Sequence, residues 1–196
     1  MKILVTEFIS LDGVVQAPGG ATEDTDGGFA HGGWSVQYFD PEVMGGVYDE
    51  LAARSDALLQ GRRTYQVSAA AWSRQSGDPF SDWINRVRKY VVSDTLAEED
   101  IAWNPTEIIR GVEFLRKVSE LRAREGGYVY VYGSATMTRA LLAADLVDEL
   151  LLTIEPIVLG GGKTIFPSNG KALPFTLVST AKAGTGAQVC RYVRAR

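Results

Sequence analysis

The pattern of apolar and polar residues divides the chain into short apolar runs and longer amphipathic segments. Residues 2–10 form the first apolar run, and their β-branched and aromatic side chains predict a strand. Later runs carry the same signal and are bounded by glycine, proline or charged residues. These predicted strands span residues 56–61, 89–93, 107–111, 128–134, 147–160, 175–181 and 187–194.

Helices are predicted between these strands, where apolar residues recur every three or four positions. The predicted helices lie within residues 40–55, 64–72, 111–125 and 134–146. Asp40 and Pro41 have the residue types of an N-cap and a first helical residue, and Ser134 is a candidate cap for the last helix. In the third helix, one apolar face is predicted to contain Val112, Leu115, Val118 and Leu121.

The order of these elements predicts one α/β domain over residues 1–196. Strands alternate with helices and are followed by a strand-rich end, which favours a mostly parallel central sheet with antiparallel C-terminal strands and helices on both faces. Residues 13–34 are glycine-rich and polar, and they are too many for an ordinary turn. Loops of this length often serve as lids or binding loops.

Composition narrows the possible functions. The 196 residues carry a net charge of −4 with an isoelectric point of about 5.1, so a general nucleic-acid-binding surface is not expected. Cys190 is the single cysteine and His31 the single histidine, which leaves no disulfide and no zinc-binding pattern. Residues 1–13 indicate a first strand rather than a signal peptide, and no apolar stretch is long enough to cross a bilayer. We therefore expect a cytoplasmic protein without a metal.

The stretch GGGKT at residues 160–164 superficially resembles a phosphate-binding P-loop. That motif requires a glycine five residues before the Gly-Lys pair, where this chain has Ile157, and it requires a helix to follow. The sequence IFPSNG follows instead. A glycine-rich loop between strands is the better interpretation.

Two adjacent arginines stand immediately after the second predicted strand. Gly61, Arg62, Arg63 and Thr64 stand between that strand and a helix. Guanidinium groups bind phosphate through paired hydrogen bonds, whereas two arginines at a helix N-terminus oppose the helix dipole unless an anion offsets them. This turn is therefore a candidate anion site, the alternative being a solvated helix start.

Two other strand ends offer similar chemistry. Gly133 and Ser134 follow the strand YVYVY and open a helix, whose free N–H groups suit a phosphate, although an ordinary capped turn has the same sequence. Ser93 ends a third strand and could donate a hydroxyl. Ligands of open α/β sheets bind at the carboxyl ends of strands, so together these turns predict one ligand with several phosphates. No GxGxxG motif is present, which argues against a standard Rossmann domain.

Five segments occur in an order that resembles a known family. They are ISLDGVV, LLQGRRTY, VVS, VYGSATMTRALL and DELLLTIEPIVLGGGKTIFP. The chain is similar over its whole length to proteins of the dihydrofolate reductase-like fold, in the branch of the C-terminal reductase domain of the bifunctional riboflavin-biosynthesis deaminase-reductase (the RibD C-terminal domain). The resemblance implies an NADPH-dependent oxidoreductase acting on a small heterocyclic or carbonyl/imine compound, such as 5-amino-6-(5-phosphoribosylamino)uracil. It also suggests a homodimer, since such proteins often form dimers.

The resemblance also implies roles for individual residues. Those expected to hold NADPH are Gly61, Arg62, Arg63, Thr64, Ser93, Gly133, Ser134, Ala135 and Thr136. Arg63 adds a charge that could favour the 2′-phosphate. Residues 10–15 match a mobile loop over the nicotinamide.

Two departures from the family pattern concern the substrate. Dihydrofolate reductases have a carboxylic acid in the first helix, where this chain has Gly45 and Gly46, so folate reduction is not expected. Riboflavin-pathway reductases usually have a lysine shortly before SLDG, where this chain has Thr6 followed by Glu7. No separate basic cluster is evident for a ribose phosphate.

Reduction by hydride transfer also needs a proton source, and acidic side chains are candidates for this role. Asp12 and Glu155 are the candidates; Asp12 could instead fix its loop, and Glu155 could pair with an arginine or the backbone. A buried carboxyl at Glu155 would have a raised pKa. Trp34, Tyr38 and Tyr48 could stack on a planar substrate or belong to the core.

Two other functions remain open from the sequence. One is a non-catalytic dinucleotide-binding or regulatory protein that retains the fold. The other is a hydrolase that uses His31 with a serine, although no G-x-S-x-G motif supports it.

Overall fold

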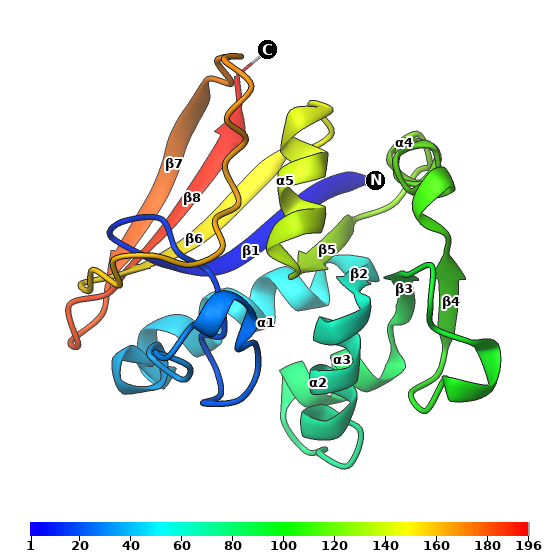
Figure 1. Cartoon of the computed structure of the whole chain (residues 1–196), viewed down its shortest axis with the longest axis horizontal. Coiled ribbons are helices and arrows are strands. Elements are labelled where there is room, and N and C mark those ends of the chain that lie inside the picture. The colour runs from blue at the N-terminus through cyan, green and yellow to red at the C-terminus, as the bar shows by residue number, and fades with distance from the viewer. Residues whose placement is uncertain (196) are drawn as a thin grey trace.

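Eight strands form one sheet in residues 1–195, the part of the chain that the computed structural model describes (Figure 1). The strand order is β4-β3-β2-β5-β1-β6-β8-β7. Strands β1 to β6 run parallel, whereas β8 pairs antiparallel with both β6 and β7. The strands are β1 (Lys2–Ser10), β2 (Ser55–Gly61), β3 (Arg88–Val92), β4 (Thr106–Ile109), β5 (Tyr128–Tyr132), β6 (Glu149–Glu155), β7 (Phe175–Lys182) and β8 (Gln188–Arg194). The predicted mixed α/β sheet is confirmed.

Helices cover both faces of this sheet because successive strand residues alternate between two apolar clusters. One cluster packs β-strand residues against α4 and α5, and the other packs them against α1, α2 and α3. The helices are α1 (Gly46–Ala53), α2 (Arg62–Trp72), α3 (Pro79–Arg86), α4 (Phe114–Arg122) and α5 (Ala135–Ala143). Short helical turns are η1 (Asp26–Gly28), η2 (Val36–Tyr38), η3 (Pro41–Gly45), η4 (Glu98–Asp100) and η5 (Gly111–Glu113).

The strand order defines the edge of the sheet at which ligands of open α/β proteins commonly bind. After β1 the chain moves outward through β2, β3 and β4, then returns to β5 beside β1 and crosses to β6. Because β1 to β6 are parallel, their carboxyl ends share one edge. Ligands in open α/β sheets bind at this edge, where the strand order reverses.

Three local predictions differ from the structure. Asp40 caps the first helical segment as predicted, accepting from the Glu42 and Val43 N–H groups, but that segment begins as a π-helical turn. In α4 the buried residues are Phe114, Val118 and Leu121, so the predicted face is confirmed at Val118 and Leu121. It is wrong at Val112, which is 95% exposed, and at Leu115, which is 41% exposed. Helix α3 was not predicted, although Asp78 and Pro79 begin it as Asp40 and Pro41 begin the first one.

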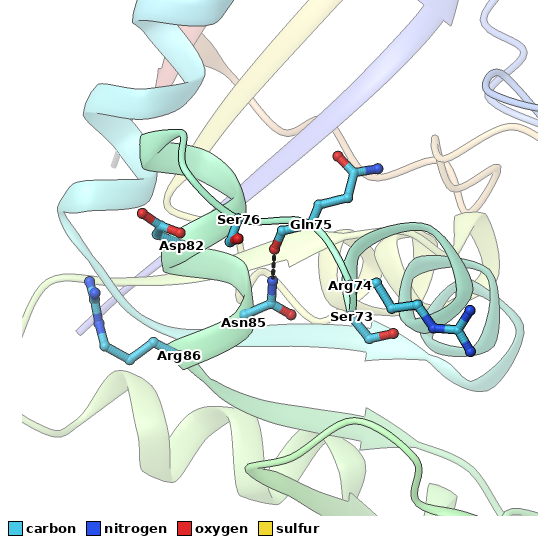
Figure 2. A pocket seen from close by; sticks show the side chains of 7 residues that line it. All are labelled: Ser73, Arg74, Gln75, Ser76, Asp82, Asn85 and Arg86. Atoms are coloured by element: carbon cyan, nitrogen blue, oxygen red, sulfur yellow. Dashed lines mark hydrogen bonds between the residues drawn. The ribbon is translucent and has the colours of Figure 1, made fainter.

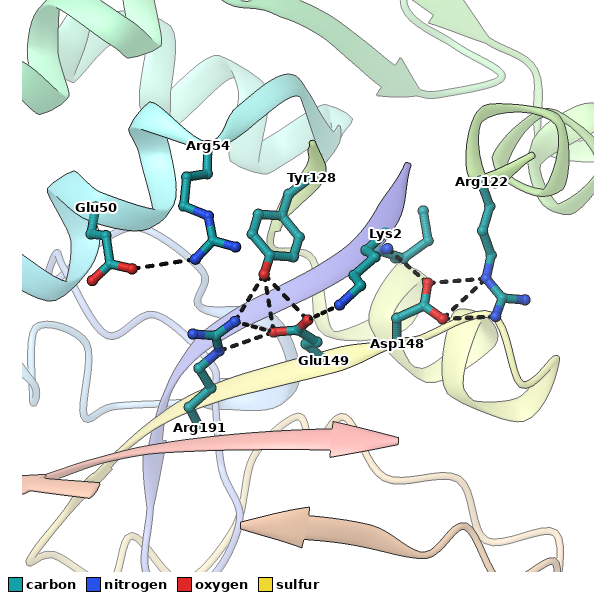
Figure 3. A network of polar contacts seen from close by, with 9 residues as sticks. Lys2, Glu50, Arg54, Arg122, Tyr128, Asp148, Glu149 and Arg191 are labelled. Carbon is teal, nitrogen blue, oxygen red and sulfur yellow. Dashed lines mark hydrogen bonds and ion pairs between the residues drawn. The ribbon is translucent and has the colours of Figure 1, made fainter. Parts of the chain in front are cut away.

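A buried ion-pair network stabilises the opposite, amino-terminal edge of the sheet (Figure 3). Glu149 is 1% exposed and accepts from Arg191 Nη2 at 2.7 Å and Nε at 2.9 Å, and from Lys2 Nζ at 3.0 Å. The Tyr128 hydroxyl donates to the same carboxylate at 3.2 Å. Burial alone would raise the pKa of Glu149, but the hydrogen bonds from Arg191 and Lys2 outweigh it, so the pKa lies below its usual value.

Candidate cofactor and substrate site

Two glycine turns pack directly against each other at the carboxyl ends of the adjacent strands β2 and β5. Gly61 ends β2, and Gly133 follows β5. A Cβ on Gly61 would lie 2.7 Å from Ser134 Oγ, and one on Gly133 would lie 2.8 Å from Thr64 Oγ1. Gly133 also has a φ of +64°, which favours glycine. Neither position has room for a side chain, so these glycines allow the starts of α2 and α5 to meet.

Neither of these two helix starts is capped by a side chain. Helix α2 follows Gly61 directly, and the hydroxyl of Ser134 makes no capping hydrogen bond. Ser134 therefore occupies the predicted N-cap position of α5, but its side chain does not form the predicted capping hydrogen bond. By contrast, Asp78 caps α3 by accepting from the Ser81 N–H at 2.9 Å. Two adjacent helix N-termini without side-chain caps suit a ligand with several phosphates.

The two arginines of the first turn have different surroundings. Arg63 donates to Asp26 at 2.8 and 3.1 Å and also to Asp24, and Lys163 Nζ contacts the same carboxylates at 2.5 Å (Asp24) and 2.7 Å (Asp26). We call these four residues the carboxylate latch. Hydrogen bonds from Arg63 and Lys163 hold the pKa of Asp26 well below its usual range. Arg62 is exposed and forms no ion pair within residues 1–195. Arg62 is thus available to an anion, whereas Arg63 is already neutralised.

The latch aspartates lie in a long loop, residues 11–35, that runs beside the segment following β6 (Figure 1). Val14 forms a β-bridge with Thr164, and Gln16 Oε1 accepts from the Lys163 N–H at 3.0 Å. The Gln16 amide also donates to the carbonyls of Asp24 and Asp26. The loop is therefore tied both to this segment and to the start of α2.

Asp12 fixes the beginning of this loop. Its carboxylate accepts from the Ser10 hydroxyl at 2.6 Å and from the N–H groups of Leu159 at 3.1 Å and Gly160 at 2.8 Å. These hydrogen bonds lower the pKa of Asp12 to about 2, and the bond from Ser10 has the largest effect. Of the two roles left open by the sequence, the geometry favours the structural one. A catalytic role for Asp12 stays a prediction that its pKa does not support.

Ser93, at the end of β3, uses its hydroxyl within its own turn. The hydroxyl accepts from the N–H groups of Thr95 at 3.1 Å and Leu96 at 2.9 Å. Arg110, which sequence reasoning missed, donates to the carbonyls of Ser93 and Leu96 at 3.0 Å each. This strand end therefore has a guanidinium group beside the predicted serine.

Glu155 ends β6 and is completely buried. Its Oε1 accepts from the Ser35 hydroxyl at 2.6 Å, whereas its buried Oε2 has no hydrogen-bond partner among the described residues. Burial raises the pKa of Glu155 to about 7 despite the bond from Ser35. The expected raised pKa is confirmed, and the group can hold or release a proton near neutral pH.

Tyr48 lies close to this acid. Its hydroxyl is 2.7 Å from Thr153 Oγ1, and Thr153 points to the same face of β6 as Glu155 because the two are separated by one residue. The rings of Tyr48 and Phe8 lie 5.8 Å apart. This part of the site therefore combines aromatic rings, two hydroxyl groups and a carboxyl group.

Trp34 and Tyr38, the other aromatic residues predicted to meet a substrate, belong to the loop region. Trp34 is buried, and its Nε1 donates to the Gln16 carbonyl at 2.8 Å, so it anchors the loop. Tyr38 is half-buried, and its carbonyl accepts from the Thr185 hydroxyl at 2.7 Å. Substrate contacts by these two residues stay predictions.

Comparison with known proteins decides the family. Residues 1–189 match the family model described as the RibD C-terminal domain. The chain belongs to the RibD C-terminal domain family. It is 26% identical to YyaP of Bacillus subtilis over 94% of this chain and 90% of that protein.

Solved structures share the fold. A Shewanella sp. PV-4 protein, provisionally named a riboflavin biosynthesis protein, is 22% identical with a TM-score of 0.76 and full coverage of both chains. A dihydrofolate reductase from Enterococcus faecalis is 14% identical with a TM-score of 0.60, covering 100% of this chain and 97% of the reductase. The expected dihydrofolate reductase-like fold is thereby confirmed.

Glu7 is a second buried acid of this RibD C-terminal domain that was not proposed as a functional residue. It is 8% exposed on β1 and accepts from the Thr138 hydroxyl of α5 at 3.0 Å. Burial raises its pKa to about 8, so it is largely protonated at neutral pH. In the sequence, Glu7 could have been recognised because it is the single acidic residue inside the apolar run of residues 2–10.

A separate hollow of about 600 Å³ lies at the far end of α2 (Figure 2). It is lined by Ser73, Arg74, Gln75, Ser76, Asp82, Asn85 and Arg86. The Asn85 amide crosses it to donate to the Gln75 carbonyl at 2.9 Å. An eleven-residue helix is about 16 Å long, so this hollow is well separated from the glycine turns at the start of α2.

The other sequence motifs have local roles. His31 is exposed, and its ring lies 5.6 Å from that of Phe29. Residues 160–164 form a loop that no helix follows, as predicted. In residues 1–195 no cluster of three metal-ligating side chains is found. No helix in that part of the chain is long and apolar enough to cross a membrane.

Replacing Glu155 with glutamine should change the pH dependence of folding. The folded-state pKa of about 7 lies above the unfolded value of 4.5, so the folded state binds the proton more tightly, and wild type loses stability as pH rises between these values. Urea unfolding should show E155Q more stable than wild type by roughly 1–3 kcal/mol at pH 8 and little different at pH 4.5. The exposed E125Q variant is the control. An equal difference at both pH values would contradict the assigned pKa.

Proposed function

We propose that this protein is an NADPH-dependent reductase that transfers a hydride to a small heterocyclic or carbonyl/imine substrate. The observation that carries the proposal is the pair of glycine turns at Gly61 and Gly133, which brings two helix N-termini without side-chain caps together beside Arg62. That arrangement fits a pyrophosphate. The similar Enterococcus faecalis reductase is complexed with NADP(H) in its structure, which supports the same choice here.

The proposed cofactor contacts follow the strand ends. The turns at residues 61–64 and 133–136 would bind the pyrophosphate, including the N–H groups near Ala135 and the hydroxyl of Thr136. Ser93 and Arg110 would lie toward the adenosine end. Arg63 would contribute only after the carboxylate latch opens, because Asp24 and Asp26 now neutralise it. Its fixed charge would favour NADPH over NADH.

In the proposed reaction, the cofactor and Glu155 would supply the hydride and the proton, respectively. When bound, the nicotinamide supplies the hydride. Glu155, with a pKa of about 7, would give its proton to a substrate nitrogen and then remain as a carboxylate beside it. Ser35 would orient this carboxyl group through the 2.6 Å hydrogen bond to Oε1. Loop residues 11–35 would exclude water while the hydride is transferred.

The proposal also includes a homodimer in the cytoplasm. The dimer is supported by β7, an edge strand on which Leu177 is 50% and Val178 52% exposed. Edge strands and exposed apolar residues favour association with another chain. The single cysteine, Cys190, is buried and unpaired, which fits a reducing compartment.

Deuterium transfer tests the reaction. The protein is incubated with NADPH carrying deuterium at nicotinamide C4 and with a panel of pyrimidines, pteridines and cyclic imines, and products are analysed by mass spectrometry. A reduced product that contains deuterium is the expected result. NADPH binding without transfer to any acceptor would favour the non-catalytic dinucleotide-binding alternative.

Opening the carboxylate latch should strengthen cofactor binding. In the double variant D24N/D26N, Arg63 and Lys163 lose their anionic partners, so the fraction of molecules with a free phosphate site rises. Calorimetry should show NADPH binding several-fold more tightly than in wild type. The variant E120Q/E125Q makes the same change in net charge at two exposed positions, in the last turn of α4 and in the segment that follows it, and should bind as wild type does. Equal affinity of the two double variants would show that the latch does not compete with NADPH.

A further inference from the structure

We propose that Glu7 senses the redox state of the cofactor: its carboxyl group is neutral beside NADPH and releases its proton to solvent when NADP⁺ occupies the site. This inference rests on the proposed reductase function and names a residue that makes the site discriminate between the two forms of the cofactor. Glu7 is a buried acid that the proposed reaction does not use, because Glu155 supplies the proton. Its position between the two halves of the site carries the inference.

The proposed cofactor has to cross β1. Its pyrophosphate is assigned to the turns after β2 and β5, whereas the proposed proton donor Glu155 ends β6. In the sheet, β1 lies between β5 and β6. Hydride transfer requires contact between the nicotinamide and a substrate that itself meets Glu155, so the nicotinamide would lie over the carboxyl half of β1.

Strand β1 extends beyond its neighbour β5 at this point. The pairing of β1 with β5 ends at Thr6 and Tyr132, whereas its pairing with β6 continues to Ser10. In the described part of the chain, residues 7–10 therefore have no strand partner on the β5 side. Glu7 is the first residue of this stretch, so it lies where β1 is open on the side of the pyrophosphate turn.

The side chain of Glu7 is directed toward the start of α5. Its Oε1 accepts from the Thr138 hydroxyl at 3.0 Å. The Thr138 N–H donates to the Ser134 carbonyl at 2.9 Å, which places Thr138 one turn from the pyrophosphate turn. Glu7 also interacts electrostatically with Tyr48 of α1, which interacts with Glu155 as well. The charge of the Glu7 carboxyl group therefore acts on both the cofactor half and the substrate half of the site.

The titratable groups that interact with Glu7 in residues 1–195 are all acidic. They are Glu23 of the loop, Tyr48 of α1, and Tyr130 and Tyr132 of β5. No lysine, arginine or histidine in that part of the chain forms a hydrogen bond or ion pair with Glu7. Burial, with a smaller contribution from Glu23, raises the pKa of Glu7 to about 8 against the effect of its hydrogen bond. A carboxylate at this position therefore lacks a counter-charge within the protein.

The oxidised cofactor would supply that counter-charge, because the ring of NADP⁺ is positively charged and the ring of NADPH is not. In the proposed reaction, the substrate receives the hydride together with the proton of Glu155. The O–H bond of Glu7 then releases a separate proton to solvent, so Glu7 adds no atom to the product. At neutral pH, tight binding of NADP⁺ requires this deprotonation, which costs free energy. Glu7 thereby weakens the binding of spent cofactor and favours its exchange for NADPH.

Calorimetric titration of NADP⁺ and NADPH over a range of pH tests the inference. The two cofactors carry the same phosphates, so the ratio of their affinities isolates the effect of the ring. In wild type, the affinity for NADP⁺ relative to NADPH should rise about tenfold or more from about pH 6.5 to about pH 9, because deprotonated Glu7 attracts the cationic ring. At about pH 7.5, titrations in HEPES and in Tris, whose ionisation enthalpies differ, should show about half a proton more released per NADP⁺ than per NADPH.

Three variants assign the effect to Glu7. E7Q keeps the acceptor for Thr138 but cannot release a proton, so its affinity ratio should not depend on pH. E155Q should retain the wild-type rise. T138V removes a hydrogen bond that favours the carboxylate and should move the rise to higher pH, which tests Glu7 even if E7Q does not fold. A rise that persists in E7Q, or that disappears in E155Q instead, would overturn the inference while cofactor binding stands. Failure of wild type to bind either cofactor would instead overturn the proposed function on which the inference rests.

Discussion

Replacing Gly133 with alanine is expected to abolish measurable NADPH binding and to destabilise the fold. The new Cβ would lie 2.8 Å from Thr64 Oγ1, 3.0 Å from its Cγ2 and 3.4 Å from its Cβ, so rotating the threonine cannot relieve every contact. The starts of α2 and α5 would have to separate, and the N–H groups that we assign to the pyrophosphate would no longer converge. The left-handed backbone adds a cost of about 1–2 kcal/mol for any residue with a Cβ.

The matched control for this variant is G170A. Gly170 has a similar φ of +74°, but a Cβ there meets no atom within 4 Å. Urea unfolding should therefore show the left-handed backbone cost in both variants, and an additional loss only in G133A. Calorimetry should show NADPH binding retained in G170A. Normal NADPH affinity in G133A would mean that the contact between the two turns does not form the cofactor site.

Breaking the buried ion pair at the amino-terminal edge should give the largest loss of stability. The variant R191M leaves the 1%-exposed carboxylate of Glu149 with only Lys2 and the Tyr128 hydroxyl as partners. Because the charge remains buried, we expect a loss of about 3 kcal/mol in the free energy of unfolding, measured by urea denaturation. Catalytic properties should change little, since Lys2, Tyr128 and Glu149 begin β1, β5 and β6, at the edge opposite the proposed site.

Two further variants make this prediction specific. The double variant E149L/R191M removes both charges and should recover part of the loss, because two apolar side chains can replace a buried pair at little cost. The variant R116M breaks exposed pairs of Arg116 with Glu113 and Glu120, and should cost less than about 1 kcal/mol. A double variant less stable than R191M would show that the network contributes more than the avoidance of an unpaired charge.

The strands and the positions of the glycine turns could be predicted because their signals are local. Apolar runs such as residues 2–10 and 128–134 end in turn residues, and parallel strands bring their carboxyl ends to one edge. Gly61 and Gly133 were therefore recognisable as candidate site residues before their contact was seen. Helix α3 was missed although Asp78 and Pro79 gave the same start signal as Asp40 and Pro41, because the helix is only eight residues long.

The contacts of individual charges could not be predicted, because they depend on how the long loop folds. Arg63 meets Asp24 and Asp26 across 39 and 37 positions of the sequence. Hydrophobic periodicity contains no information on the path of a polar loop. The same loop brings Ser35 to Glu155 across 120 positions of the sequence. The burial of Glu155 could therefore be predicted from its place at the end of an apolar strand, but its hydrogen bond with Ser35 could not.

The central claim, that this RibD C-terminal domain binds NADPH at the turn after β2, is tested most directly by calorimetric titration of NADPH and NADH. Wild type, R62A and R74A are compared, since Arg62 and Arg74 lie near opposite ends of α2. We predict that wild type and R74A bind NADPH more tightly than NADH, and that R62A loses about 1.5–3 kcal/mol, a factor of roughly ten or more. Failure of wild type to bind either dinucleotide would contradict the account.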